Sequence, residues 1–472
     1  MTAADDQTQD AIVDFALTAT GEVPDPRVLH MAASRFLDTL GALTAGFGSE
    51  AGASARRFAQ GQPAGACSVI GTGARADASA AAFANATAAR YPELSDVLSL
   101  PGRRSGGHPS DVIMPLLALS EETASGGVAF LSAVALAYEI YYRLAKNVAL
   151  DEYGLDHTNL ASLAGAVAGG CLVALKPEQL AQCVAIAAVS STVSRRSRDN
   201  PASSWKASAS GAAARVAVFA VQAAAAGIEG PPAPFSGAWG WPGRERERER
   251  AAPVTFEGEP GWDGLSHVAV KNRPACMAAI PAAIATERAI AGIGSGGVPV
   301  LSIRRVTVRV FDLAWERCGR PEAARHPRTA EEADHSIPYV VASTLCDGRL
   351  KVNSYAPHRL NDAQLRDLMT RIMVVPDPDL SERHRALSGS RPAHVQVELE
   401  SGSVAVGEVD RVPGDLATPL TDGELEEKFR DNAEPVLATP AQDEVIASVW
   451  ALKAGAGPRL LTESFERVRR SE

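Results

Sequence analysis

Apolar residues recur with the period of an α-helix through most of the first 255 residues of the chain. Apolar side chains three or four positions apart are typical of helices that pack one face against a core. Asp77 precedes one of these segments and is a candidate N-terminal cap. We predict helices over residues 27–45, 77–90, 112–123, 129–150, 162–175, 177–190 and 208–227, with no strands between them.

The pattern changes after about residue 265. Residues 298–311 and 394–400 alternate between apolar and polar with the period of a half-buried strand, and 403–409 could pair with the latter as a hairpin. Helical signals recur at 275–292, 337–345, 362–369, 421–432 and 442–451. The prediction is a mainly α protein with a helical domain over 1–265, a smaller α+β domain over 266–410, and helical residues over 411–472. The pattern leaves open whether the C-terminal part packs back on the first domain.

The length of 472 residues supports two domains, because one hydrophobic core rarely serves so long a chain. Apolar residues make up 46%, charged residues 22% and aromatic residues 5%, which suits a globular protein of closely packed helices. The longest apolar stretches, 126–142 and 161–175, are interpreted as buried core helices rather than membrane spans. The first ten residues are acidic and polar without a signal-peptide pattern, which predicts a cytoplasmic protein without membrane attachment.

Charge and cysteine spacing exclude several classes of site. A formal charge of -10 disfavours nucleic acid as a partner, so an anionic ligand would be attracted by local positive charge. The six cysteines lie far apart, which argues against a zinc site, an iron–sulfur cluster or a disulfide framework and predicts buried, inert thiols. The alternating Arg/Glu run at 244–250 is interpreted as a solvated loop rather than a docking patch.

A turn opened by glycine, Gly106-Gly107-His108-Pro109-Ser110-Asp111, precedes a long apolar helical segment. Loops on a rigid scaffold present side chains to ligands, and an imidazole exchanges its proton near neutral pH. These properties favour His108 as a reactive group. The alternative is structural, with Ser110 or Asp111 capping the helix predicted from residue 112.

Lysine is scarce, since only seven of the 46 basic residues are Lys. Lys206 follows Trp205 in a run of small residues that leads into a predicted helix, and Lys271 ends the apolar run at 268–270. In such settings a compact ammonium group could project among closely spaced backbones. The alternative is a surface lysine whose stem lies along apolar residues while its charge stays in water.

Seven motifs occur in order along the chain: Arg90-Tyr91, Gly106 to Asp111, Gly154-Leu155-Asp156-His157, Arg198 with Ser203-x-Trp205-Lys206, Gly227 to Pro231, Ala333 to Tyr339, and Pro419-Leu420-Thr421 with Lys428-Phe429. Each is weak alone, but together they are specific. Over nearly its whole length the chain resembles the 2-methylcitrate dehydratase (MmgE/PrpD) family. The motifs around Asp156, Lys206 and Asp334 are more similar to the methylcitrate dehydratase branch than to the cis-aconitate decarboxylase branch.

The resemblance implies a large helical domain made from both ends of the chain, a smaller α+β lid domain inserted between them, and a homodimer. Members act on small di- and tricarboxylates by elimination, hydration, decarboxylation or epimerisation, without a metal or an organic cofactor. The pocket residues that carry over are Glu93, Asp96, His108, Asp156, His157, Arg198, Lys206, Lys271 and Tyr339.

These residue types suit an elimination. Proton removal beside a carboxylate builds negative charge, which Lys206 and Lys271 would stabilise. His108 and His157 would divide the roles of base and acid in an order that the sequence leaves open, with Asp156 or Glu93 setting their tautomer and pKa. Glu93, Asp96 and Arg198 would line the substrate pocket. Tyr339 would either bind a substrate carboxylate through its hydroxyl or anchor the lid domain as a buried aromatic residue.

The stretch Pro92-Glu93-Leu94-Ser95-Asp96-Val97 departs from the family's usual Leu-Asp-Phe-Asn-Asp-Thr. Glu93 is one methylene longer than Asp, and Val97 replaces a hydroxyl by a methyl group that cannot hydrogen-bond a substrate. We therefore expect a cofactor-independent hydro-lyase for an acid related to 2-methylcitrate but smaller or less polar. The alternatives are a decarboxylase or epimerase of a similar acid, and a member that only binds a ligand.

Overall fold

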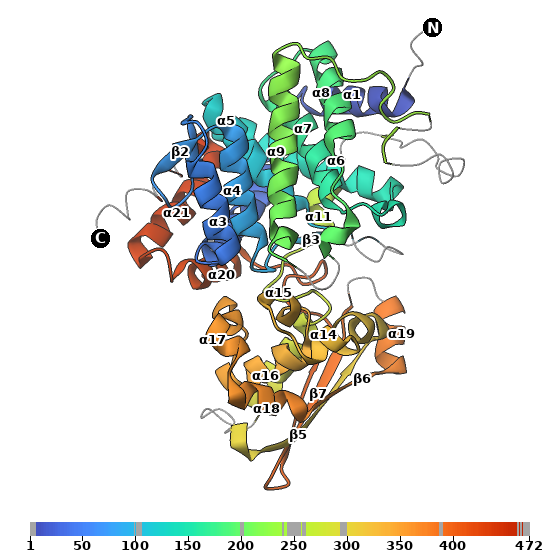
Figure 1. Cartoon of the computed structure of the whole chain (residues 1–472), viewed down its shortest axis with the longest axis vertical. Helices are drawn as coiled ribbons and strands as arrows, with labels where there is room; N and C mark the ends of the chain where they lie inside the picture. Colours follow the sequence, from blue (N-terminus) through green and yellow to red (C-terminus); the bar gives the residue numbers. More distant parts are fainter. Residues whose placement is uncertain are drawn as a thin grey trace.

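The computed structural model describes residues 6–98, 100, 106–198, 203–237, 240–242, 256, 261–292, 300–386, 390–459, 462 and 465. It shows a larger body of helices, which contains both ends of the described chain, and a smaller body with a sheet (Figure 1). The mainly α fold class is confirmed. The Arg/Glu run at 244–250 and residues 298–299 of the first predicted strand lie outside the described residues.

The long helices of the larger body match the predicted helices to within a few residues and add two, α1 and α3, that the predicted ranges do not include. Asp77 caps α4 as predicted, since its side chain accepts a hydrogen bond from the backbone N–H of Ala80 at 3.1 Å. The helices are α1 (Gln7–Ala19), α2 (Pro26–Gly46), α3 (Glu50–Gln60), α4 (Ala78–Arg90), α5 (Ile113–Glu122), α6 (Gly127–Asn147), α7 (Thr158–Leu172), α8 (Pro177–Ser190), α9 (Trp205–Ala225), α20 (Asp422–Ala433) and α21 (Thr439–Ala451).

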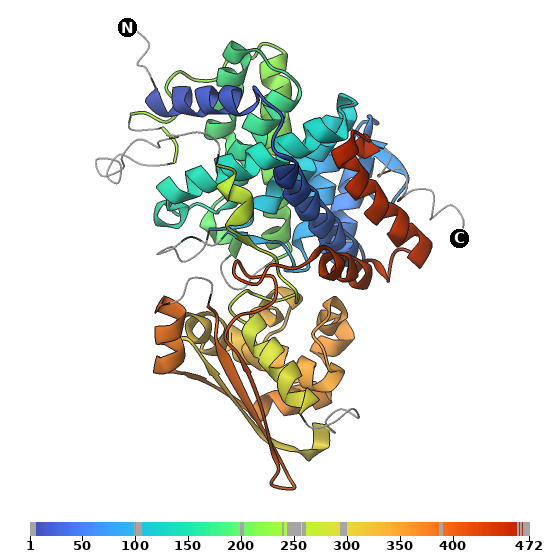
Figure 2. The same ribbon diagram turned by 180° about the vertical axis from the view of Figure 1, so that it is seen from behind.

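The C-terminal helices α20 and α21 pack against α2, so both ends of the chain contribute to the larger body (Figures 1 and 2). Its core takes residues from 12 to 270 and from 425 to 465, whereas the core of the smaller body takes residues from 269 to 412. The exact domain boundaries at 265 and 410 stay a prediction. Helices α6 and α9 are long and apolar enough to cross a membrane, but 78% and 67% of their apolar windows lie buried inside the molecule.

Small residues let α4 and α9 approach closely. A Cβ atom at Gly211 of α9 would lie 2.4 Å from Thr87 Oγ1 and 2.7 Å from the Phe83 carbonyl oxygen of α4. Such contacts are far shorter than packed side chains tolerate, so the crossing requires glycine. As a result, the C-terminal end of α4 and the N-terminal end of α9 lie side by side.

Short strands interrupt the helical region, which corrects the expectation that it contains none. Strands β1 (Cys67–Val69) and β2 (Ala74–Ala76) form an antiparallel pair, and β3 (Val97–Leu98) pairs with β4 (Val268–Ala269). Segments of two or three residues are too short to display an alternating pattern. The β3–β4 pair fastens the loop after α4 to the segment that carries Lys271, and Val97 packs against the core of the smaller body.

The smaller body is a four-stranded sheet in the order β6-β5-β7-β8. The predicted hairpin is confirmed, because β7 (Ala393–Leu399) and β8 (Val404–Val409) are antiparallel neighbours. Strand β5 (Ile303–Val310) alternates between buried and more exposed positions, as its sequence predicts. Strand β6 (Ile372–Pro376) runs parallel to β5 and was not predicted, because its run Ile-Met-Val-Val-Pro has no alternation.

Helices α12 (Ile280–Ala291) and α16 (Ile337–Asp347) pack on this sheet. Helix α18 (Ala363–Thr370) lies beside α16 (Figure 1). The close fit is visible at Gly407 of β8, where a Cβ atom would lie 1.9 Å from the Ala285 carbonyl oxygen of α12. Shorter helices complete the fold: α11 (Asp263–Ser266), α13 (Asp312–Ala314), α14 (Glu322–Arg325), α15 (Ala330–Ala333), α17 (Pro357–Leu360) and α19 (Pro378–Ala386).

A buried ion pair between Lys428 of α20 and Asp38 of α2 joins the two ends of the larger body. Removing one partner leaves the other charge buried and uncompensated. We predict that Lys428→Met lowers the free energy of unfolding by about 3–5 kcal/mol, measured by urea denaturation. Asp38→Asn added to Lys428→Met should recover part of the loss, and Lys351→Met on an exposed side chain should change little. Equal stability of Lys428→Met and the parent would show that the pair does not hold the helices together.

Candidate active site

Most of the predicted site residues gather where the larger body meets the smaller one, in the region around β3 in Figure 1. Each belongs to a loop or to the end of an element, where side chains are free to converge. They come from the loop after α4 (Glu93, Asp96), the turn before α5 (His108), the segment before α7 (Asp156, His157), the start of α9 and the turn before it (Lys206, Arg198), and the segment after β4 (Lys271).

Glu93 stands at the centre and contacts three cations. Lys271 Nζ donates to Glu93 Oε1 at 2.6 Å, Arg90 Nη1 donates to Oε2 at 3.2 Å, and Lys206 Nζ lies 3.5 Å from Oε2. The backbone φ of Glu93 is +51°, an uncommon conformation for a side-chain-bearing residue. Burial raises the pKa of this carboxyl, but Lys271, Arg90 and Lys206 outweigh it and hold the pKa well below its usual range.

Both ring nitrogens of His108 are engaged. Nδ1 lies 2.5 Å from the Asp96 carbonyl oxygen, and Nε2 lies 2.7 Å from Arg90 Nη2. A carbonyl only accepts and a guanidinium only donates, so Nδ1 carries the proton and Nε2 accepts. Burial, followed by the charge of Arg90, holds the pKa of His108 well below its usual range. His108 is therefore a neutral imidazole.

The turn before His108 depends on glycine. Gly107 has a φ of +77°, and a Cβ atom there would lie 2.2 Å from Tyr141 Oη and 2.8 Å from the His157 side chain. The interpretation of Ser110 or Asp111 as a helix cap is wrong. A 3-10 turn at Pro109–Val112 precedes α5, and no side chain caps the N-terminus of either the turn or the helix. Asp111 instead accepts a hydrogen bond from Ser210 Oγ of α9 at 2.7 Å.

The ring of His157 lies 5.0 Å from that of His108, between centroids. Its Nε2 is 3.5 Å from Arg198 Nη2 and 3.9 Å from Asp111 Oδ2. Burial lowers the pKa of His157 to about 3, with Arg198 also lowering it and Asp156 opposing. Arg198 is held by Asp156, whose carboxylate it grips through Nε at 2.8 Å and Nη2 at 3.2 Å.

Both carboxylate oxygens of Asp96 accept hydrogen bonds from other residues of the protein. Tyr138 Oη donates to its Oδ2 at 2.8 Å, and the Ser110 N–H donates to its Oδ1 at 3.1 Å. Burial raises the pKa of this carboxyl. Asp96 thus holds the turn before α5 in place through its side chain and orients His108 through its backbone carbonyl.

Lys206 connects the two bodies. Its Nζ lies 3.4 Å from Asp334 Oδ1 and 3.5 Å from His335 Nδ1, both in the smaller body after α15. Asp334 in turn contacts His335 Nδ1. Burial and Lys206 act to lower the pKa of His335, but Cys276 and Asp334 outweigh them and raise it to about 9. His335 is therefore the protonated imidazole of this cluster at neutral pH.

Tyr339 does not join the site through its hydroxyl. The residue is fully buried in the core of the smaller body, and its hydroxyl donates to the Ser354 carbonyl at 2.6 Å. Its ring stacks on that of Tyr355, at 5.8 Å between centroids. The interpretation of Tyr339 as a buried anchor is therefore the one that matches its contacts.

Sequence reasoning missed Arg90, Asp111 and Tyr355. Tyr355 has a buried hydroxyl without a hydrogen-bond partner among the described residues, and the charges of Asp334 and Glu93 act on it. Arg90 and Asp111 belong to two of the seven motifs. Their residue types alone are equally consistent with a basic residue at a helix end and an acidic residue that caps a helix. Cys276 also differs from the inert thiol that was predicted, because a hydrogen bond from Cys318 lowers its pKa well below the usual range.

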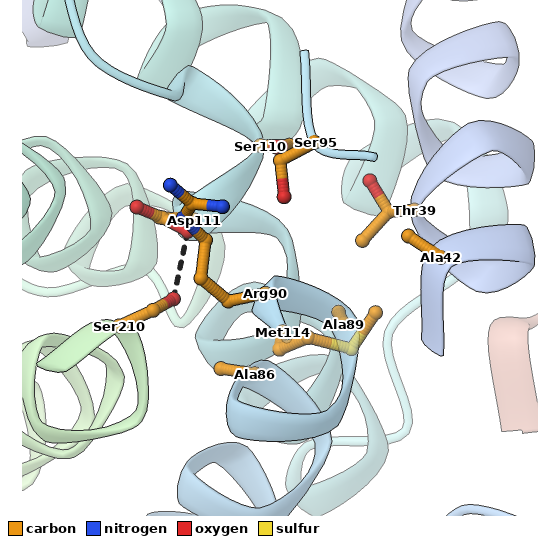
Figure 3. Close-up of a pocket in the computed structure, with 10 residues that line it drawn as sticks. All are labelled: Thr39, Ala42, Ala86, Ala89, Arg90, Ser95, Ser110, Asp111, Met114 and Ser210. Carbon is orange, nitrogen blue, oxygen red and sulfur yellow. Dashed lines mark hydrogen bonds between the residues drawn. The ribbon is translucent and has the colours of Figure 1, made fainter. Parts of the chain in front are cut away.

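A cavity of about 10 Å³ lies behind the site, lined by Thr39, Ala42, Ala86, Ala89, Arg90, Ser95, Ser110, Asp111, Met114 and Ser210 (Figure 3). This volume suits about one water molecule rather than a carboxylic acid. Arg90 Nε and Asp111 Oδ2, two polar atoms of residues that line it, are buried without a hydrogen-bond partner among the described residues. Within the same part of the chain, no group of three or more His, Cys, Asp or Glu side chains is arranged to hold a metal ion.

Basic groups and carboxylates are closely paired in this network. Arg90, Lys206, Lys271 and Arg198 are its basic groups, and Glu93, Asp156 and Asp334 are the carboxylates paired with them. Burial raises the pKa of Asp96 and raises that of Asp111 to about 6, which still leaves Asp111 mostly ionised at neutral pH. The concentration of four basic side chains is nevertheless a feature that suits an anionic ligand.

Comparisons with known proteins find matches over most of the chain. The family model described as the MmgE/PrpD N-terminal domain matches residues 10–243, and that of the MmgE/PrpD C-terminal domain matches residues 274–453. The 2-methylcitrate dehydratase of Cupriavidus necator is 25% identical over 72% of this chain and 73% of its own length. The cis-aconitate decarboxylase of Mus musculus is 27% identical over 39% of this chain, and the match spans 37% of its length.

The low pKa of His157 predicts an acid sensitivity. A histidine that resists protonation in the folded state stabilises the fold fully above its unfolded pKa of about 6.5 and loses this contribution as pH falls towards 3. Between pH 7 and pH 5, His157 should account for about 2 kcal/mol of the stability that the parent loses in urea denaturation, and His108, whose pKa is also lowered, adds to the parent's loss. His157→Asn should be less sensitive to pH by that amount, whereas His326→Asn, at an exposed side chain, should behave as the parent does. If the stability of the two variants depended equally on pH, the low pKa of His157 would be contradicted.

Proposed function

The chain belongs to the MmgE/PrpD family, and on that premise we propose that it is a cofactor-independent hydro-lyase acting on a small di- or tricarboxylic acid related to 2-methylcitrate. The observation that carries the proposal is the cluster of Arg90, Lys206 and Lys271 around the single carboxylate of Glu93, next to two neutral imidazoles. The family includes dehydratases and decarboxylases, whose substrates share carboxylates.

The cations suit the charge that an elimination creates. When a base removes a proton from the carbon beside a carboxylate, the electron pair of that bond spreads onto the carboxylate oxygens. Donors held in place before the reaction stabilise this charge without reorganising, and they act strongly where water is excluded. Lys206 and Lys271 are nearly buried and lie on opposite oxygens of Glu93, so an acid bound beside them would meet two fixed ammonium groups.

The pKa values divide the proton-transfer roles differently from the expectation that His108 and His157 share them. Both imidazoles have a lowered pKa, so both are unprotonated at neutral pH and suited to accept a proton. His335, whose pKa is raised to about 9, is suited to donate one. We assign the base to His108 or His157 and the acid to His335, which protonates the departing hydroxyl so that it leaves as water.

A decarboxylase is the second candidate, and the matches to cis-aconitate decarboxylases support it. Loss of carbon dioxide also leaves charge that cations stabilise, but it releases a different product. A panel of 2-methylcitrate, citrate, malate and cis-aconitate, followed by ultraviolet absorbance of the conjugated double bond and by carbon dioxide release, separates the two reactions. The absence of both signals across the panel would overturn the proposal. The same family resemblance supports a homodimer, which light scattering of the purified protein tests.

Lys206 offers the cleanest test of charge stabilisation. Its ammonium contacts lie at 3.4–3.5 Å and are looser than the 2.6 Å contact of Lys271, so its removal costs little folding energy. We predict that Lys206→Met lowers kcat on the order of a hundredfold while its melting temperature stays within a few degrees of the parent. Lys351→Met serves as the control with unchanged rate. A parallel loss of folding and activity would make Lys206 a scaffold residue.

The cations also predict independence from divalent metals, since they supply the positive charge that a metal would supply. Dialysis against a strong chelator should leave turnover of the active panel substrate unchanged. The control is the same dialysis followed by addition of magnesium or iron. Activity that is lost and then returns with either metal would contradict the mechanism.

A further inference from the structure

His108 has no free lone pair in this structure. Nδ1 donates to the Asp96 carbonyl at 2.5 Å, and Nε2 accepts from Arg90 at 2.7 Å. A base must present an unshared electron pair to the proton that it removes. His108 therefore cannot act as a base while Arg90 stays where it is, and the imidazole alone cannot turn away, because its carbonyl partner holds it from the other side.

Arg90 is itself placed to change partners. It ends α4, its side chain is 3% exposed, and its guanidinium spans Glu93 and His108. Glu93 is already shared with Lys206 and Lys271, and Arg90 Nε has no hydrogen-bond partner among the described residues. The imidazole that it caps is neutral, and an uncharged acceptor binds a guanidinium less strongly than a carboxylate does.

We propose that Arg90 caps His108 in the free enzyme and that a substrate carboxylate draws the guanidinium away from Nε2, so that the base becomes available only when substrate is bound. The inference rests on the proposed function. In the step, the Arg90–Nε2 hydrogen bond breaks and an Arg90–carboxylate hydrogen bond forms. Nε2 then takes the carbon-bound proton, while the electron pair of that bond passes to the substrate carboxylate.

Charge balance supports the same order of events. Burial and Arg90 are the largest causes of the low pKa of His108, followed by His157 and Lys271, and Glu93 opposes them. The Asp96 carbonyl and the Tyr141 side chain are further polar groups that face the turn. Once Arg90 has a carboxylate partner, its effect on His108 is neutralised, which raises the affinity of Nε2 for a proton. Binding would thus both uncover the base and strengthen it.

The test follows the imidazole nitrogens of His108 directly. Protein labelled with ¹⁵N-histidine is titrated by NMR with and without tricarballylate, a tricarboxylate that has no hydroxyl group to eliminate, and His108→Gln assigns the signal. In the parent, tricarballylate should shift Nε2 out of its hydrogen-bonded position and raise the pKa of His108 by about one pH unit or more. In Arg90→Met, the pKa should be raised before ligand is added and respond little to it.

Kinetics provide the second measurement. Arg90→Met should raise KM on the order of tenfold or more, since a charged hydrogen bond to the substrate is lost, with a smaller effect on kcat. Arg90→Lys should recover part of the binding and serves if Arg90→Met does not fold, because a lysine can also cap Nε2. Arg75→Met, on strand β2 and outside the site, is the matched control with unchanged spectra and rates.

The proposal would be overturned by a His108 signal that does not respond to saturating tricarballylate in the parent, or by one that is the same in Arg90→Met and the parent without ligand. Failure of tricarballylate and citrate to bind the parent would also overturn it, because the cap needs a carboxylate to release it. If the protein turns over none of the panel acids but its His108 signal responds to tricarballylate, the proposed hydro-lyase function is wrong and the proposed release of His108 by Arg90 is retained.

Discussion

The buried carboxylate of Glu93 is the interaction on which the rest of the site depends. It gathers Lys271 from the segment after β4, Arg90 from the end of α4 and Lys206 from the start of α9. None of these charges could stay buried without a partner, since isolated charges are costly in a protein interior. Because the three cations share this carboxylate, an acid bound beside it would meet several charged donors close together. Glu93 also has a positive φ, an uncommon backbone conformation for a residue with a side chain.

Small residues make this convergence possible. The network requires the end of α4 to lie against α9 and the turn before α5 to lie against α6 and α7, and glycine stands at both contacts. Thr87 packs against Gly211, and Tyr141 and His157 pack against Gly107. At both glycines a Cβ atom would lie too close to these side chains. The close backbone contacts at these two glycines therefore help to position the site.

The fold was largely predictable because long helices and the β7–β8 hairpin carry periodic patterns, and Asp77 carries a capping chemistry that acts locally. Strand β6 and the short β3–β4 pair lack such a pattern and depend on the partner strand for their structure. In the site, residue types and motif order pointed to Glu93, His108, Lys206 and Lys271 as candidates, and the structure places both lysines against Glu93. The cap that Arg90 places on His108, and the commitment of the Tyr339 hydroxyl to Ser354, depend on packing between distant segments that no local pattern records.

The three imidazoles near the site show how environment rather than residue type places a proton. Burial, with a guanidinium near each ring, lowers the pKa of His108 and His157, whereas Cys276 and Asp334 raise the pKa of His335. The two unprotonated rings belong to the larger body and the protonated ring belongs to the smaller one. An elimination needs both a base and an acid at the same substrate, so neither body holds the full set of proton-transfer groups. Lys206, which contacts Glu93 in one body and Asp334 in the other, holds the two halves of this chemistry together.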